Sequence, residues 1–188
     1  MKFPESLKPY RGIIFFIVAL LSAHFFWKLT VIGDENGEQV LFFGLNISQP
    51  FIILAAHIAR VTDAILHLIG FNTCIFPGNV VKHGNGNAVH IIWGCTGLKQ
   101  TFIFTVILFF SRGKLISKLW YIFFGWMCIY LFNVFRIIFI TALMEKHPEW
   151  FNLLHEHLFK YLFYIMIFLI WVYWEEKLAD KSTKGENE

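Results

Sequence analysis

Residues 119–144 read LWYIFFGWMCIYLFNVFRIIFITALM, an apolar stretch that contains a single charged side chain, that of Arg136. A helix of about 20 apolar residues is long enough to cross the hydrocarbon core of a membrane. Residues 13–32, 97–111 and 154–174 have the same character, and we expect each of these stretches to be a membrane span. The sequence therefore predicts an all-α multi-pass membrane helix bundle.

The composition of the whole chain supports this class of protein. Of its 188 residues, 57% are hydrophobic and 19% are aromatic, which is more than a soluble domain of this length requires. The net charge is only +3, and the basic residues form short clusters beside the apolar stretches. This pattern indicates membrane orientation and not nucleic-acid binding. Three cysteines without a metal-ligand spacing make a disulfide scaffold unexpected.

A polar stripe distinguishes residues 50–70 from the four spans. This segment is long enough for a helix, but His57, Arg60, Asp63 and His67 recur along one side of it. Such a stripe cannot face lipid. We therefore expect an amphipathic or partly inserted helix at residues 50–70.

Residues 78–94 predict a small extracytoplasmic β-hairpin. The valines at 80 and 81 and the apolar residues 89–93 suit two short strands. Residues 84–87 between them read GNGN, which favours a turn.

The basic residues set the orientation of the spans. Those that precede the first span and those within residues 112–118 belong on the cytoplasmic side. Because an even number of crossings must separate them, the first and second spans cross and the amphipathic helix stays at the outer face. We expect the first span to be retained, since its apolar run is too long for a cleavable signal peptide. Residues 1–174 then form a single membrane domain, and the charged tail 175–188 is cytoplasmic.

Cys95 is the first candidate for chemistry. It lies in the stretch WGCTG at residues 93–97, where a glycine-rich segment meets the second span. The dipole at a helix N-terminus stabilises a thiolate, so we expect a lowered pKa and a reactive thiol. The alternative is a small buried apolar side chain, as we expect for Cys128. Lys99 and Gln100, just inside the span, are expected to line a polar cavity or to extend toward the membrane surface.

Arg136 is the strongest single signal, because an arginine inside a span is unfavourable by roughly 2.5–3.5 kcal/mol. It must therefore face a partner or a wet cavity. Asn133 lies one turn earlier on the same helix face and can serve the same site. A guanidinium there can stabilise an oxyanion. The alternatives are a structural ion pair, for example with Asp63, and extension toward the outer headgroups.

His155 opens the last span and can act as the general base or acid for a thiol. On the expected topology, Cys95, Arg136 and His155 all fall in the outer half of the membrane. His157 is a rival for the same role, and an ordinary interfacial histidine is the alternative for both. None of the histidine spacings is a strong zinc pattern, so we expect neither a metal nor a cofactor.

Taken together, these residues resemble the exosortase/archaeosortase family of membrane cysteine proteases and transpeptidases. The resemblance rests on Cys95-Thr96-Gly97-Leu98 at the start of a span, on Asn133-x-x-Arg136 in the next span, and on a histidine at the start of the last one. A hairpin with glycine turns ahead of the cysteine also looks like the family. Where members of the family often carry a glycine a few residues after the histidine, this chain has Phe159 or Lys160, which keeps His157 in contention.

The resemblance implies a function in protein sorting. The catalytic residues would be Cys95, Arg136 and His155. Residues that bind substrate or support the site would be Asn133, Thr96, Gly97 and His157. The enzyme would lie in the cytoplasmic membrane with its active site on the extracytoplasmic side. Its substrates would be secreted proteins whose C-terminal tail combines a short motif, a transmembrane helix and a basic cluster, and a thioester on Cys95 would be the intermediate.

Two other classes of protein remain open on the sequence. In a small transporter or channel-like protein, Arg136, Asp63 and the histidines would line a polar pathway. In a non-catalytic assembly factor, Cys95, Arg136 and His155 would all tolerate conservative replacement. Replacing Cys95 with alanine separates the classes, because only a covalent enzyme depends on the sulfur.

Overall fold

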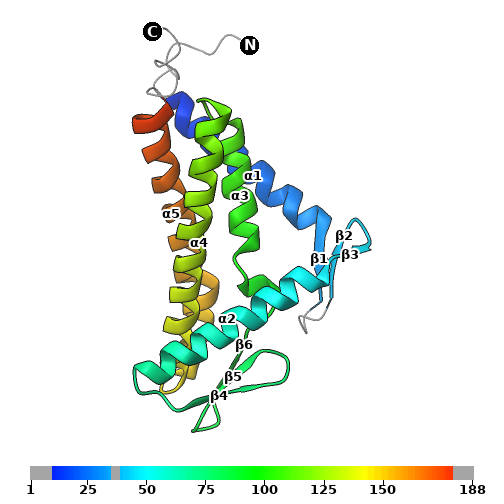
Figure 1. Cartoon of the computed structure of the whole chain (residues 1–188), viewed down its shortest axis with the longest axis vertical. Helices are drawn as coiled ribbons and strands as arrows, with labels where there is room; N and C mark the ends of the chain where they lie inside the picture. Colours follow the sequence, from blue (N-terminus) through cyan, green and yellow to red (C-terminus); the bar gives the residue numbers. More distant parts are fainter. Residues whose placement is uncertain (1–9, 35–38, 180–188) are drawn as a thin grey trace.

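The computed structural model describes residues 10–34 and 39–179, and it shows a helix bundle with two small sheets (Figure 1). The bundle consists of α1 (Arg11–Thr30), α3 (Leu98–Phe110), α4 (Leu115–Met144) and α5 (Phe159–Tyr173). Two π-helical segments, Leu153–Leu158 and Trp174–Ala179, flank α5. The helix α2 (Ser48–Leu68) runs obliquely across one end of the bundle, whereas α3, α4 and α5 run side by side. Most of the expected charged tail lies outside the described residues.

Within the described residues, four helical segments are long and apolar enough to cross a membrane. They are Arg11–Thr30, Ser48–Leu68, Leu115–Met144 and Pro148–Leu178. The segment α3 is apolar but has 13 residues. At about 1.5 Å per residue it spans only ~20 Å of a hydrocarbon core that is ~30 Å thick. Its contacts with α1, α4 and α5 nevertheless place it inside the bundle.

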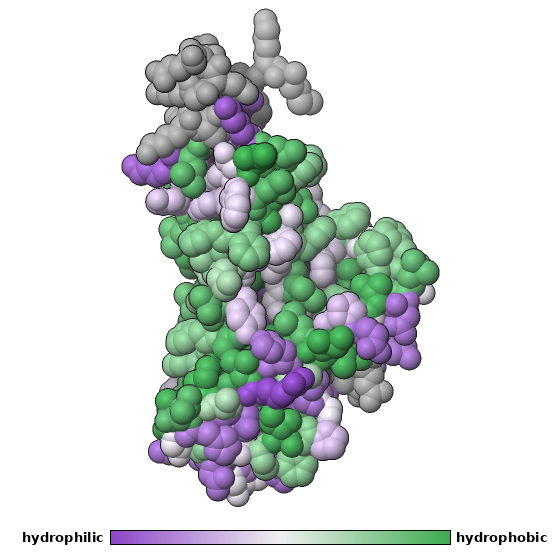
Figure 2. Space-filling view, in the orientation of Figure 1, coloured by the Kyte–Doolittle hydropathy of each residue, from purple (hydrophilic) through white to green (hydrophobic). Residues whose placement is uncertain are grey.

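The surface of the bundle is apolar. Large side chains such as those of Leu29 and Trp120, each 77% exposed, point outward. Hydrophobic residues cover most of the visible face of the bundle, and hydrophilic residues gather near α2 and the sheets (Figure 2). An apolar outside is expected where lipid replaces water as the surrounding solvent. The chain is therefore a multi-pass membrane protein, as the sequence predicts.

The β structure is more extensive than the single hairpin expected from the sequence. The strands β5 (Val80–His83) and β6 (Ala88–His90) pair within the predicted hairpin, but β4 (Thr73–Phe76) adds a third antiparallel strand. A second three-stranded sheet follows α1, and its first strand overlaps the end of the expected first span. Its strands are β1 (Val31–Gly33), β2 (Val40–Phe42) and β3 (Leu45–Asn46). Strands of two or three residues are too short to produce an alternating pattern, which is why the sequence did not predict them.

The β4–β6 sheet is hydrogen-bonded to the C-terminal end of α4. The side chain of Asn87 donates to the carbonyl oxygen of Met144 at 2.9 Å, and Asn85 donates to that of Glu145 at 2.5 Å. The imidazole of His83 donates through Nε2 to the carbonyl oxygen of Thr141 at 2.8 Å. These bonds satisfy carbonyl groups that the end of a helix leaves without partners.

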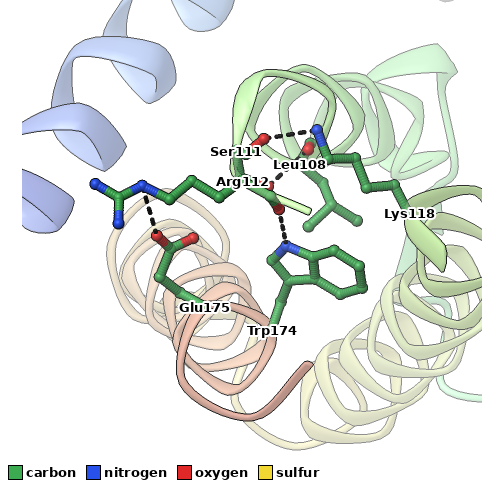
Figure 3. A network of polar contacts seen from close by, with 6 residues as sticks. All are labelled: Leu108, Ser111, Arg112, Lys118, Trp174 and Glu175. Carbon is green, nitrogen blue, oxygen red and sulfur yellow. Dashed lines mark hydrogen bonds and ion pairs between the residues drawn. The ribbon is translucent and has the colours of Figure 1, made fainter. Parts of the chain in front are cut away.

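The C-terminal end of α3 is held by a network of side chains from α4 and from the segment after α5 (Figure 3). The buried ammonium of Lys118 donates to the carbonyl oxygen of Ser111 at 2.6 Å. The indole of Trp174 donates to the carbonyl oxygen of Arg112 at 2.9 Å, and the Arg112 guanidinium lies 4.0 Å from the Glu175 carboxylate. The network fixes the position of α3 along the bundle, and with it the position of the residues that precede α3.

Candidate active site

Cys95 closes a 3₁₀ turn, Trp93–Cys95, directly before α3. The turn is locked by Thr96, whose backbone N–H and hydroxyl both donate to the carbonyl oxygen of Trp93, at 3.3 and 2.7 Å. Gly97 joins the turn to α3 with a φ of 77°, in the left-handed region that favours glycine. A Cβ at this position would lie 3.3 Å from the side chain of Asn133. Gly97 is therefore needed both for the conformation and for the close approach to α4.

The β1–β3 sheet anchors the same turn from the other side. The indole of Trp93 donates to the carbonyl oxygen of Asp34 at 3.1 Å. Its ring lies so close over Gly33 that a Cβ there would overlap it, at 2.2 Å. The sheet that the sequence did not predict thus positions the residue two places before the cysteine.

The thiol of Cys95 is buried, with 6% of the residue exposed. It packs among apolar side chains of α2 and α4, including Ala55, Ala59 and Ile137. Burial raises the pKa of the thiol, while the charge of Arg136 and the backbone at the start of the turn act in the opposite direction. The expected lowering of the pKa by a helix terminus is therefore wrong. The helix itself begins only at residue 98, and the apolar surroundings of the sulfur outweigh its dipole.

His155 lies beside the thiol. Its Nε2 atom is 3.9 Å from Sγ of Cys95. The imidazole stacks on Phe151, with ring centroids 5.2 Å apart and planes at 9°, and Nδ1 is 3.9 Å from the carboxylate of Glu156. A carboxylate near Nδ1 favours the tautomer with its proton there, which leaves the Nε2 lone pair facing the thiol. His157, two residues later, is exposed and does not line the cavity described below.

The π-helical segment Leu153–Leu158 carries this histidine. Such segments are rare and occur frequently at functional sites. The sequence proposed His155 and His157 for the same role, and the structure brings only His155 to the sulfur.

Asn133 and Arg136 approach the turn from α4. Asn133 is fully buried, and its Nδ2 donates to the carbonyl oxygen of Cys95 at 2.7 Å. Arg136 is 6% exposed and lies over the ring of Phe163, 5.8 Å from its centroid. Its Nε atom has no hydrogen-bond partner among the described residues. The alternative of an ion pair between Arg136 and Asp63 is not observed among the described residues. The deep burial of Arg136 is incompatible with the other alternative, extension toward the headgroups.

Arg136 and His155 face a cavity of about 460 Å³, whereas Asn133 and Cys95 are not among its lining residues, and Cys95 adjoins it through His155. Arg136, His155, Glu156 and the exposed Gly94 line it near the thiol. The expected cavity residues Lys99 and Gln100 also line it. Within residues 10–34 and 39–179, no group of three or more histidine, cysteine, aspartate or glutamate side chains is arranged to hold a metal ion.

The sequence did not identify the rest of the cavity wall. This part comes from α1, α2, α5 and the segments beside α1 and α3, and it consists mainly of aromatic and basic side chains. Its residues are His24, Trp27, Lys28, Val31, Phe51, Trp93, Lys160, Phe163 and Tyr164. A basic residue near the end of an apolar stretch was the available signal for Lys28 and Lys160, but that pattern is equally typical of residues at the membrane surface.

Comparison with known proteins identifies one family. Residues 38–176 match the family model described as transmembrane exosortase (Exosortase_EpsH). The match includes α2 to α5, and with them Cys95, Asn133, Arg136 and His155. No curated protein and no solved structure matches the chain.

Proposed function

The chain belongs to the transmembrane exosortase family, and from this membership and the geometry around Cys95 we propose that it is a membrane-embedded cysteine protease/transpeptidase. It cleaves the C-terminal sorting signal of secreted proteins through a thioester on Cys95. The observation that carries the proposal is the 3.9 Å approach of Cys95 Sγ to His155 Nε2 at a cavity that Arg136 also lines. Apo structures often show longer contacts between a nucleophile and its base than the substrate complex does.

In the first step, His155 Nε2 takes the thiol proton as the sulfur attacks the scissile carbonyl carbon. Because the pKa of the thiol is raised, the sulfur is protonated at neutral pH and depends on this base. The backbone N–H groups of Cys95 and Thr96 already donate within the turn. The oxyanion therefore needs a side-chain donor, and the unpaired Arg136 Nε supplies it.

In the second step, the carbon–nitrogen bond breaks and the imidazolium of His155 gives its proton to the leaving amine. The product is a thioester between Cys95 and the new C-terminus of the secreted protein. His155 then deprotonates the acceptor nucleophile, which attacks the thioester carbonyl, and the proton returns to the sulfur as it leaves. Asn133, Thr96 and Gly97 hold the cysteine turn throughout.

The active site faces the extracytoplasmic side in this proposal. The start of α1, the α3–α4 turn and the end of α5 lie at one end of the bundle (Figure 1), and they include the basic residues Arg11 and Arg112. The positive-inside rule assigns this end to the cytoplasm. Although α2 is long enough to span, it crosses the opposite end of the bundle and exposes Arg60 and His67, which supports an interfacial position. The apolar helix of the sorting signal enters from the lipid beside the cavity.

The test is to detect the thioester. The full-length enzyme is produced together with a secreted protein from the same cell that carries a C-terminal motif, an apolar helix and a basic cluster. We expect a covalent adduct that hydroxylamine releases, absent in Cys95→Ala and present in the matched variant Cys128→Ala. His155→Ala slows resolution as well as formation, so any adduct it forms persists longer. Normal sorting by Cys95→Ala would reject the enzyme and favour a conduit or an assembly factor.

A further inference from the structure

Three lysines on three different helices line the cavity that Cys95 and His155 adjoin. Lys28 lies in the last turn of α1, Lys99 in the first turn of α3 and Lys160 at the beginning of α5. All three line the same cavity, and the charges of Lys28 and Lys160 both reach Lys99. None of them forms a hydrogen bond or an ion pair with another described residue.

The cavity has a strong excess of positive charge. Besides the three lysines it contains the guanidinium of Arg136, and Glu156 is its one carboxylate among the described residues. Four cations against one anion leave a net charge of +3 if the histidines are neutral. Lys28 and Lys160 are exposed and Lys99 is half-buried, and a cleft lined by charges of one sign attracts ions of the opposite sign. This arrangement therefore indicates an anionic ligand.

Two further observations define the ligand. The Nε atom of Arg136 is buried without a partner among the described residues, so the wall also offers an unused hydrogen-bond donor. Beside the cations the wall is aromatic, with Trp27, Phe51 and Phe163. An anion that carries an apolar body matches such a wall better than a free ion does.

The depth of the lysines selects the class of amphiphile. Lys28 lies in the last turn of α1, a span of 20 residues whose C-terminal end is the extracytoplasmic end in the proposed orientation. Lys160 lies inside the helical segment Pro148–Leu178 and Lys99 in the first turn of the short helix α3, so Lys28 sets the level of the site in the membrane. Helix ends of membrane spans lie at the level of the lipid headgroups, where phosphate is the abundant anion.

We propose that Lys28, Lys99 and Lys160 form a binding site for the phosphate group of a phospholipid headgroup, at one side of the cavity beside Cys95. The aromatic wall contacts the glycerol and the first part of the acyl chains. Binding itself is independent of the chemistry at Cys95. A role for the bound phospholipid in catalysis, as a second ligand beside the thioester, rests on the proposed function.

Native mass spectrometry of the full-length protein in a neutral detergent tests the site, with a short-chain phosphatidylglycerol as the probe. We expect one probe molecule to bind the wild type and Cys95→Ala equally. The double variant Lys99→Gln/Lys160→Gln should weaken binding by about 30-fold, because each lysine near a membrane surface makes a substantial electrostatic contribution. The matched control Lys82→Gln/Lys146→Gln removes the same charge outside the cavity and should bind like the wild type. Lys99→Arg/Lys160→Arg keeps the charge and should retain binding, which covers the case in which the glutamine variant fails to fold.

Competition experiments identify the source of the phosphate. Inorganic phosphate that displaces the probe at equal concentration would overturn the proposal in favour of a free anion. Displacement by an acidic peptide with the probe's affinity would overturn it in favour of the substrate chain. Equal binding to both double glutamine variants, or none to the wild type, would also overturn it. Thioester formation is measured separately. If the protein forms the adduct but binds no probe, only the phospholipid site is refuted. If it binds the probe but forms no adduct, only the proposed function is refuted.

Discussion

The hydrogen bond from Asn133 to the carbonyl oxygen of Cys95 provides a sharp test of the site. Replacing the fully buried Asn133 with leucine keeps the branching at Cγ but removes the donor that lies 2.7 Å from this oxygen. A buried carbonyl group without its partner destabilises by about 1–3 kcal/mol. The turn can relieve this by rotating, which moves Sγ away from His155 Nε2, and their separation is already 3.9 Å. If the whole penalty falls on the reactive geometry, thioester formation slows by about 5–150-fold.

The assay is the initial rate of the hydroxylamine-sensitive adduct, measured together with thermal unfolding in the same detergent. Thr141→Val is the matched control, because it removes a fully buried hydroxyl from the same helix whose bond to Ile137 stays within α4. We expect this variant to lose stability and to keep its rate. A wild-type rate for Asn133→Leu would refute the reasoning. Rates that fall in proportion to lost stability in both variants would also refute it.

Four further substitutions and a pH series test the remaining assignments. His155→Ala should slow thioester formation by about 10²–10⁴-fold, the usual contribution of a general base. His157→Ala should keep the wild-type rate. An equal loss of rate in both variants would contradict the assignment of His155 as the base. Gly97→Ala should lower the free energy of unfolding by about 1–2 kcal/mol in a denaturant titration, because the residue has a φ of 77°; an unchanged midpoint would show that the turn relaxes. Alkylation of Cys95, followed by mass spectrometry, should rise with pH to a midpoint above the ordinary thiol range, because burial raises the pKa. Arg136→Gln should move that midpoint higher still, because the guanidinium lowers the pKa; a downward shift would contradict this.

The sequence could predict the helices, and it could also predict that Cys95, Arg136 and His155 lie on the same side of the membrane. Both predictions follow from the geometry of membrane spans. The thickness of a membrane dictates the length of an apolar span, so composition alone indicates the helices. Consecutive spans run in opposite directions, which brings the start of one, the end of the next and the start of the last to the same side. His155 also precedes the buried residues Phe159 and Phe163 at intervals of four, so it shares their inward face, and His157 does not.

Features that depend on contacts between distant segments were not predictable. The β1–β3 sheet contains strands of three residues or fewer, and its importance lies in a contact between Gly33 and Trp93 that no local pattern indicates. The raised pKa of Cys95 reflects apolar neighbours contributed by α2 and α4. Lys28 and Lys160 resemble ordinary surface lysines in the sequence, and only the packing of α1 against α3 and of α3 against α5 brings them to one cavity.

The raised pKa of the buried thiol argues against a nucleophile only if the thiol must already be charged in the resting state. In apolar surroundings a preformed thiolate–imidazolium pair would be expensive, because both ions lose hydration. In the proposed reaction, the neutral thiol and imidazole avoid that penalty until a substrate carbonyl arrives. Charge then develops on the carbonyl oxygen, where Arg136 has an unpaired Nε to receive it. An interaction that is made only as this charge develops lowers the barrier without stabilising the resting enzyme, so the raised pKa and the unpaired guanidinium belong to one arrangement.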